Sequence, residues 1–430
     1  MKNNNFQIIV IVIFIAAAVF SVFVFSGSIP IGKDDKNVGQ GTVVLWGTFP
    51  ATTMSSIIDN FNTTNKNFTV QYVEKSKDTF NQDLLEALAE GTGPDMFFLP
   101  DNLAISYNKK IFTIPYTSYP VASFKNNFAS AGEVFLTNKG IMAFPIAIDP
   151  LMMYYNRGIL DSNGVVYPPK TWNDLVDLVP TLTKKDELGK IIKSTVAMGQ
   201  FVNVNNAKDI LATLFMQTGN PIVVEKSGAH VSALNDDTRK HNLGAVLKFY
   251  VDFADSLTNV YSWNRSLPSS VDVFSREDSA FYFGFASELP ILVNKNPNQN
   301  FLIAPMPQIK NTASKITLGK VHGIAISSFS KNFNTAYIAA GLMSSGNFPA
   351  SFARAFNMTP ARRDLLAVKP NDNYSPYTYD SALFARSWLD PSPKSSDDIF
   401  RNMIEKVLSN LLSPEEAVND ASSKIDLLLR

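Results

Sequence analysis

The sequence contains no cysteine and only three histidines among its 430 residues. The absence of cysteine excludes a disulfide framework, thiolate zinc sites, a cysteine nucleophile and a lipid-modified N-terminal cysteine. Lys and Arg together equal Asp and Glu, with 38 of each, so the chain carries no formal net charge. This balance implies no basic surface for nucleic acid, and we expect no nucleic-acid partner.

Motifs of catalysis and cofactor binding are also scarce. His230, His241 and His322 stand far apart and in no metal-ligand spacing, which favours surface or packed histidines over a metal site. The glycines of 39–41 and 91–93 lack the third glycine of a dinucleotide fingerprint, and the sequence has no P-loop or nucleophile elbow. We therefore predict no cofactor, no metal and no catalytic residue. A carboxylate pair for glycoside hydrolysis stays open, because its spacing is set in space and not along the sequence.

The long hydrophobic run of the sequence lies at the N-terminus. Residues 8–25 are apolar except for Ser21, and as a helix they would span about 27 Å, close to the thickness of the hydrocarbon core. Lys2 precedes the run and the charges of 33–36 cancel, which predicts a short cytoplasmic segment at 1–7 and a transmembrane anchor at 8–26. The alternative is a cleaved signal peptide. Both interpretations export the rest of the chain, which begins with a flexible tether at 27–41.

Strand and helix patterns alternate after the tether. The predicted elements are a strand at 42–46, a helix at 54–61, a strand at 68–73, a helix at 80–88 and a strand at 95–99. This order predicts a parallel sheet, whose ligands bind at the carboxyl ends of the strands, here 46–50 and 100–102. The remainder is α/β with more helix, and Thr171 and Ser413 are predicted N-caps, the latter within a capping box.

Several segments resemble a known protein family. Residues 91–98, GTGPDMFF, are similar to the glycine-proline-aspartate turn and strand of bacterial extracellular solute-binding proteins of family one, the sugar-binding class. Residues 141–156, IMAFPIAIDPLMMYYN, resemble the segment in which the chain of maltodextrin-binding proteins first crosses between lobes. Further similar segments follow in the family's order at 168–172, 261–264, Phe274, 304–307, 323–327 and 359–362. The resemblance extends over about 42–428.

This resemblance implies an α/β fold of two discontinuous lobes, the type II periplasmic-binding-protein-like fold. Lobe one would comprise 42–147 plus 320–358, and lobe two 149–319 plus 359–430. The lobes would close on a small solute, a sugar or oligosaccharide, and deliver it to the permease subunits of an ABC-type importer. Such a protein is a monomer, is not an enzyme and acts outside the cytoplasmic membrane. The predicted N-terminal helix would replace the lipid-modified cysteine that is absent here.

The resemblance also implies site residues. Asp149 matches the family's acidic acceptor for sugar hydroxyls at the first crossing, and Asp101 matches the acidic residue after the third strand. Trp46 ends the first strand, where the family places groups that face the cleft. Carboxylates accept hydrogen bonds from hydroxyls and aromatic faces cover ring C–H groups, as a neutral sugar requires. Each residue also has a structural interpretation: a helix cap for Asp101, a turn before Pro150 for Asp149, and a core position for Trp46. The other predicted site residues are Phe49, Tyr282, Gly284 and Trp388.

Three classes of function are compatible with the sequence. The first is the binding subunit of an importer, which the resemblance favours. The second is a membrane-tethered enzyme that degrades glycans, which would show turnover and not stoichiometric capture. The third is a ligand-responsive protein that reports to a sensor or receptor.

Overall fold

The computed structural model describes residues 39–235, 242–312 and 314–430. The predicted cytoplasmic segment, the predicted anchor and most of the tether lie outside the described residues, as does His241. Within the described part of the chain, no helix has both the length and the apolar character that a membrane crossing requires.

Lobe one begins with the alternation of strands and helices that the sequence predicts. Its first three strands pair in parallel, with the first strand between the other two. The helices present the expected apolar faces, and Gly91, with a left-handed φ of 69°, ends the second of them. The elements of lobe one are β1 (Gly41–Gly47), α2 (Ala51–Thr64), β2 (Phe68–Glu74), α3 (Phe80–Glu90), β3 (Met96–Pro100), η1 (Asp101–Leu103), α4 (Ala104–Tyr107), η2 (Asn108–Lys110), α5 (Val121–Asn127), η3 (Ser130–Phe135), α12 (Phe333–Met343) and α13 (Phe348–Ala355).

Lobe two is richer in helix. Thr171 and Ser413 both cap helices, as the sequence predicts, and both lie within complete capping boxes, of which the sequence predicts the one at Ser413. The elements of lobe two are α6 (Arg157–Ser162), α7 (Trp172–Leu182), β5 (Lys184–Lys185), β6 (Ile191–Val196), α8 (Ala207–Gln217), β7 (Val223–Lys226), β8 (Ala229–Ser232), α9 (Leu243–Asp252), α10 (Ser270–Ser275), β9 (Ser279–Phe285), η5 (Ala286–Glu288), α11 (Leu289–Lys295), β10 (Phe301–Pro305), α16 (Pro393–Leu408) and α17 (Pro414–Leu429).

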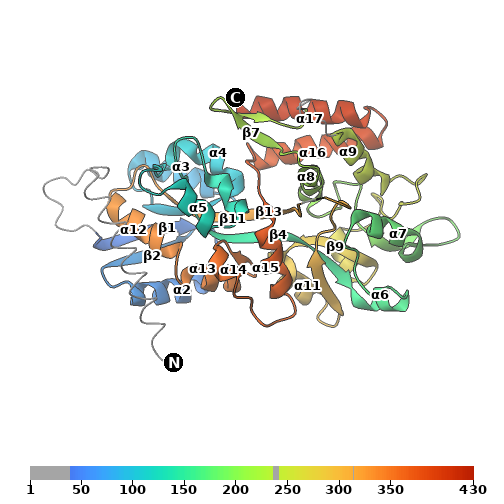
Figure 1. Cartoon of the computed structure of the whole chain (residues 1–430), viewed down its shortest axis with the longest axis horizontal. Coiled ribbons are helices and arrows are strands. Elements are labelled where there is room, and N and C mark those ends of the chain that lie inside the picture. Colours follow the sequence, from blue (N-terminus) through green and yellow to red (C-terminus); the bar gives the residue numbers. More distant parts are fainter. Residues whose placement is uncertain (1–38, 236–241, 313) are drawn as a thin grey trace.

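Two long strands join the lobes. β4 (Phe144–Asn156) runs from lobe one into lobe two, and β11 (Thr317–Ile326) returns antiparallel to it from lobe two into lobe one (Figure 1). Around them the order β2-β1-β3-β11-β4-β9-β6-β5 makes one sheet that extends through both lobes. Two short strands join it at the crossing, since β12 (Thr359–Pro360) pairs with β4 and β13 (Ala385–Arg386) pairs with β11.

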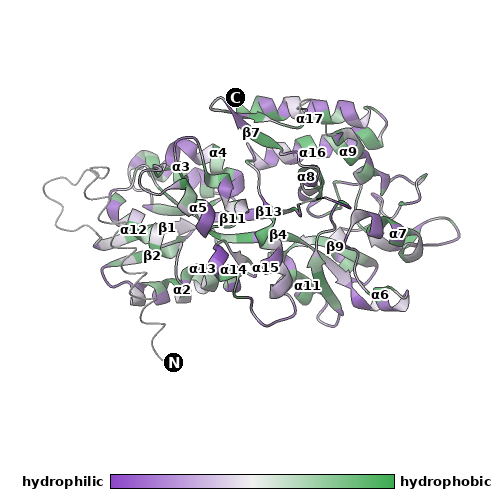
Figure 2. Ribbon diagram, in the orientation of Figure 1, coloured by the Kyte–Doolittle hydropathy of each residue, from purple (hydrophilic) through white to green (hydrophobic). Residues whose placement is uncertain are grey.

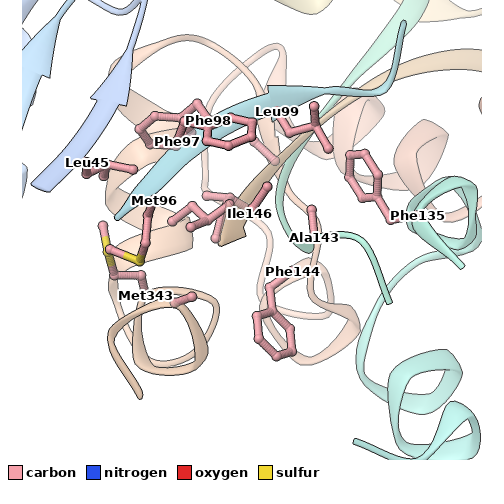
Figure 3. Packing of buried hydrophobic residues seen from close by; sticks show 14 of the residues in the cluster. Leu45, Met96, Phe97, Phe98, Leu99, Phe135, Ala143, Phe144, Ile146 and Met343 are labelled. Atoms are coloured by element: carbon pink, nitrogen blue, oxygen red, sulfur yellow. The ribbon is translucent and has the colours of Figure 1, made fainter. Parts of the chain in front are cut away.

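The buried side chains form separate clusters on either side of the crossing. Along β4, Ile148 belongs to the cluster of lobe one, part of which Figure 3 shows, whereas Leu151 belongs to that of lobe two. Beyond the crossing, alternate residues of β4 face opposite ways. Leu151 and Met153 pack in the main cluster of lobe two, while Met152 and Tyr154 pack in a smaller third cluster. We call the side of β4 that carries Leu151 and Met153 its front face, and the side that carries Met152 and Tyr154 its back face. The smaller third cluster is the back-face cluster.

Helices cover both faces. In Figure 1, α8 and α16 lie above β4 on the front side, while α11 and α15 (Ser375–Leu383) lie below it on the back side. Figure 2 shows the expected hydropathy, because α16 and α17 alternate between hydrophobic and hydrophilic residues whereas the enclosed strand β4 is mostly hydrophobic. The apolar faces of α8, α16 and α17 therefore complete the main cluster of lobe two, and α11 contributes Leu292 to the smaller third cluster.

The C-terminal part of the chain divides differently from the predicted lobe boundary. The sequence assigns 359–430 to lobe two, but the buried side chains between Ala361 and Ala385, including those of α14 (Arg363–Leu366) and α15, pack in the cluster of lobe one. The reason is that β12 pairs with β4 at Ala147 and Ile148, on the lobe-one side of the crossing. The chain joins the cluster of lobe two at Trp388.

Candidate functional site

A polar cavity of about 190 Å³ lies at the crossing, on the front side. Residues of both lobes and of the crossing strand β11 line it. We call it the front cavity. Its lining residues are Asp101, Asn102, Lys208, Asp209, Leu318, Lys320, Ser387, Trp388, Asp390, Pro393 and Asp397.

The two lysines of the front cavity both have carboxylate partners. Lys320, on β11, places its Nζ 3.4 Å from an oxygen of Asp209 at the start of α8, and 3.6 Å from the centre of the Phe285 ring. Lys208 lies 3.0 Å from Asp390 and 2.5 Å from Asp397. Burial lowers the pKa of Lys208, but the two carboxylates outweigh it and the net pKa is raised. The front cavity therefore has no lysine without an anionic partner.

Asp101 connects lobe one to the crossing strands. Its carboxylate accepts hydrogen bonds from the backbone N–H of Asn102 at 2.9 Å, from the N–H of Val321 on β11 at 3.0 Å, and from the hydroxyl of Ser387. Burial raises the pKa of Asp101 to about 6, although these hydrogen bonds and the charge of Lys320 oppose the rise. Asp101 thus lies where the sequence predicts, at the carboxyl end of β3, and its oxygens are engaged by the protein.

Asp149 lies on β4 directly opposite Lys320. It is buried, and both of its carboxylate oxygens accept hydrogen bonds from Ser287 of η5, from the N–H at 3.0 Å and from the hydroxyl at 2.6 Å. Burial raises the pKa of Asp149 to about 7, against the effect of these hydrogen bonds and of Lys320. Asp149 is not among the residues that line the front cavity. Its contact with a ligand stays a prediction.

The two aromatic residues predicted after β1 pack against protein neighbours. Trp46 is buried, and the Nζ of Lys75 lies 3.9 Å from the centre of its ring. Phe49 packs edge-on against several aromatic rings, including Phe352 of α13 at 4.8 Å between ring centres and His322 of β11 at 5.4 Å. Burial lowers the pKa of His322 to about 4, so this histidine is neutral near pH 7. These contacts favour the core interpretation of Trp46.

The remaining predicted residues separate onto the two faces. Trp388 lines the front cavity. Tyr282 is buried in the back-face cluster, where its hydroxyl donates to Glu288. A Cβ on Gly284 would lie 2.4 Å from the Tyr282 ring, so the close approach that requires glycine here is to a tyrosine of the same strand. Of the seven predicted site residues, the front cavity brings together Asp101 and Trp388.

Sequence reasoning missed most of the lining of the front cavity. Lys208 and Asp209 open α8, Lys320 lies on β11, and Asp390 and Asp397 flank the start of α16. These residues converge from distant segments and form no local motif. Among the residues that the structure describes, no group of three or more His, Asp or Glu could hold a metal ion.

Comparison with known proteins identifies the family. Residues 56–374 match the model of the bacterial extracellular solute-binding proteins. The chain belongs to this family. The predicted resemblance is therefore confirmed, and the protein is a solute-binding protein that acts outside the cytoplasm. A binding protein of Brucella abortus is 21% identical over 390 residues, which cover 86% of this chain and 88% of that protein.

Solved structures share the whole architecture. The cyclic alpha-maltosyl-1,6-maltose binding protein of Arthrobacter globiformis has a TM-score of 0.74 at 16% identity, covering 91% of this chain and 99% of its own. A cyclo/maltodextrin-binding protein in complex with maltotetraose has a TM-score of 0.71 at 18% identity, covering 89% and 96%. The GacH receptor of Streptomyces glaucescens, solved without ligand and with acarbose, has a TM-score of 0.66 at 18% identity, covering 91% and 98%. At these identities the structures establish the two-lobed α/β fold.

Proposed function

We propose that this protein is the substrate-binding subunit of an ABC-type importer, and that it captures a neutral sugar or oligosaccharide in the front cavity. The observation that carries the proposal is the composition of that cavity. Asp101 and Asn102 come from lobe one, Lys208 and Asp209 from lobe two, and Lys320 from a strand that joins them. A solute bound there touches both lobes, and its hydroxyls meet carboxylates, an amide and a serine hydroxyl.

The charges of the cavity favour a neutral ligand. Lys208 and Lys320 are both paired with carboxylates, so neither is left to neutralise a phosphate or an acidic sugar. A neutral sugar adds no charge to such a site, and its hydroxyls bond well to oxygens that are already ionised. The sugars present in the related structures, maltotetraose and acarbose among them, are consistent with this ligand class.

The proposal includes the other functional predictions from the sequence. The protein acts as a monomer without catalytic activity and delivers its ligand to the permease subunits of the importer. Residues 8–26 anchor it in the cytoplasmic membrane with the C-terminal bulk outside. Of the predicted site residues, Asp101 and Trp388 line the front cavity. Contact of Asp149, Trp46, Phe49, Tyr282 and Gly284 with the ligand stays a prediction from the family resemblance.

A thermal-shift screen of the full chain against neutral sugars, polyols, phosphosugars and oligopeptides tests the ligand class. A neutral sugar at about 100 times its Kd should add about 2.7 kcal/mol to the free energy of unfolding, and chromatography should return it unchanged. Asn102→Ala should weaken binding roughly tenfold by removing an amide from the cavity, whereas the exposed control Asn298→Ala should not. Stabilisation by phosphosugars or peptides alone would refute the ligand class, and recovery of a cleaved sugar would indicate an enzyme.

A further inference from the structure

A second cavity, of about 270 Å³, lies on the back face of the crossing strands. Tyr154, Ala286 and Ile303, all members of the back-face cluster, form one wall. Met358 and Tyr379, which pack with the cluster of lobe one, form the opposite wall. None of its lining residues also lines the front cavity. We call it the back cavity.

The walls of the back cavity suit a flat apolar group. Three tyrosines line it, Tyr154 on β4, Tyr374 before α15 and Tyr379 within α15, together with the aliphatic side chains of Leu289 and Ile303. The Tyr154 hydroxyl is fixed, since it donates to the carbonyl oxygen of Phe285 at 2.8 Å. The volume of about 270 Å³ lies just below the range for pockets of drug-sized ligands, roughly 300–1,000 Å³, which corresponds to a smaller molecule. Aromatic side chains of this kind pack against an aromatic ring in offset or edge-on contacts.

The back cavity also contains one exposed arginine and one carboxylate. Arg354, in the last turn of α13, lines it, and within the described ranges the structure gives its guanidinium no hydrogen bond and no carboxylate partner. Asp372 is the carboxylate of this cavity, and its Oδ1 accepts hydrogen bonds from the backbone N–H groups of Tyr374 and Ser375 at 2.8 and 2.7 Å. The carboxylate is thus held by the start of α15. This arrangement differs from the front cavity, where both lysines are paired.

We propose that the back cavity is a second small-molecule site, which takes a small aromatic carboxylate. The guanidinium of Arg354 offers a planar pair of donors that match a carboxylate, and such bidentate pairs are the stronger kind of charge-assisted hydrogen bond. The aromatic ring of the ligand packs among the tyrosines and the aliphatic residues. Since the two cavities share no residue, this ligand and the solute of the front cavity bind at the same time.

Binding of 4-fluorobenzoate to the full chain, followed by fluorine NMR in a nonionic detergent, tests the proposal. We expect saturable binding, and affinity at least tenfold lower for the neutral analogue 4-fluorobenzamide. Arg354→Gln should weaken benzoate binding by tenfold or more, because a hydrogen bond to a charged group is lost. The matched control is Arg276→Gln, an exposed arginine outside both cavities, which should leave the affinity unchanged.

A second pair of variants separates the two cavities. Leu289→Trp fills the back cavity and should abolish benzoate binding, while Asn102→Ala in the front cavity should not alter it. Circular dichroism of each variant verifies that the fold is retained. Absence of saturable benzoate binding, or equal affinity of the parent and Arg354→Gln, would overturn the proposal. Loss of benzoate binding in Asn102→Ala would place the benzoate in the front cavity and overturn it as well.

Discussion

Lys320 on β11 and Asp149 on β4 face each other as directly paired residues at the point where both strands cross between the lobes. Each also reaches into lobe two, Lys320 to Asp209 and Asp149 to Ser287. The charge of Lys320 opposes the effect of burial on the pKa of Asp149 but does not cancel it. The crossing therefore contains a carboxyl group that titrates near neutral pH.

We expect the free energy of unfolding to fall as pH rises from about 4 to about 7. Burial raises the pKa of Asp149 from 3.8 to about 7, so between these values the folded protein holds a proton that the unfolded chain has released. The stability contributed by this proton is fully present below the pKa of Asp149 in the unfolded chain, and it is lost as pH rises through the pKa of Asp149 in the folded protein. The loss is at most about 1.4 kcal/mol per pH unit. Asp101, whose pKa burial raises to about 6, acts in the same direction. His322, whose pKa burial lowers to about 4, acts in the opposite direction, but the two carboxyl groups together outweigh this one histidine. Urea unfolding at steps from about pH 4 to about pH 8 measures the slope.

Asparagine variants show which carboxyl groups cause this dependence of stability on pH. Asp149→Asn and Asp101→Asn cannot titrate, so each should show a smaller loss of stability over the same range than the parent. The difference should be larger for Asp149→Asn, because the pKa of Asp149 is raised further. A slope in Asp149→Asn as steep as that of the parent would show that this carboxyl group does not contribute.

Lys208 should be among the charged residues whose removal costs most stability. Its side chain is 13% exposed, and it holds Asp390, which is 4% exposed, and Asp397. Lys208→Met leaves these carboxylates without their cation, which typically costs about 3–5 kcal/mol for a buried pair. The control is Lys248→Met, which removes a helical pair with Asp252 whose lysine is 60% exposed, and should cost less than about 0.5 kcal/mol. Similar losses in the two variants, measured by urea unfolding, would contradict the structural assignment.

Local patterns in the sequence were sufficient to predict much of lobe one. The alternation of period-two and helical patterns from β1 to β3, and the stop at Gly91, correspond to the structure because each depends on neighbouring residues. The N-caps Thr171 and Ser413 were predictable for the same reason. The role of β11 was not, because a strand that pairs with both β3 and β4 is defined by partners far away in the sequence.

The candidate site was only partly predictable. Asp101 follows a predicted strand, and the rule on carboxyl ends of strands places it correctly at the front cavity. The same reasoning cannot show that Ser287 occupies both oxygens of Asp149, because this contact joins separate segments of the chain. Asp209, Asp390 and Lys320 likewise meet only when the lobes are assembled.

Two glycine-to-alanine variants should have opposite effects on stability. A Cβ on Gly319 would lie 2.8 Å from the Cβ of Ala385 and 3.0 Å from a methyl carbon of Ile148, where three crossing strands meet. Gly319→Ala therefore overpacks the crossing, and we expect a loss of about 1–3 kcal/mol. Gly341 lies within α12 with open space around it, so Gly341→Ala should raise the free energy of unfolding by about 0.4–1 kcal/mol. Denaturant unfolding of both variants measures the two changes in the free energy of unfolding. An unchanged free energy of unfolding in Gly319→Ala would refute the tight packing.

The proposed anchor predicts where the intact chain is found. Residues 8–25 form an apolar run of transmembrane length, so the chain should fractionate with membranes and resist extraction with carbonate. Replacing two residues in its centre, Ala17→Lys and Ala18→Lys, should release the protein, because each charge at the centre of the bilayer costs about 2.5–3.5 kcal/mol. Recovery of a mature form that begins near Gly27 would instead show that the run is a cleaved signal peptide.

The last prediction concerns closure of the lobes. Asp101 and Asn102 contribute to the front cavity from one lobe and Lys208 and Asp209 from the other, so a bound solute contacts both. Such a ligand must bind the closed arrangement more tightly than the open one, because equal affinity for two states shifts no equilibrium. Closure is therefore the expected response to the cognate sugar.

The absence of cysteine allows this movement to be measured directly, because introduced cysteines are the only thiols that a dye can label. Ser76→Cys in lobe one and Lys394→Cys in lobe two are at exposed positions, and energy transfer between dyes at these sites should rise with the cognate sugar. A control pair within lobe one, Ser76→Cys with Asn60→Cys, should show no change, since the lobe moves as a unit. Constant transfer between the lobes at saturating sugar would indicate a rigid receptor, and the importer mechanism proposed for this protein would then be wrong.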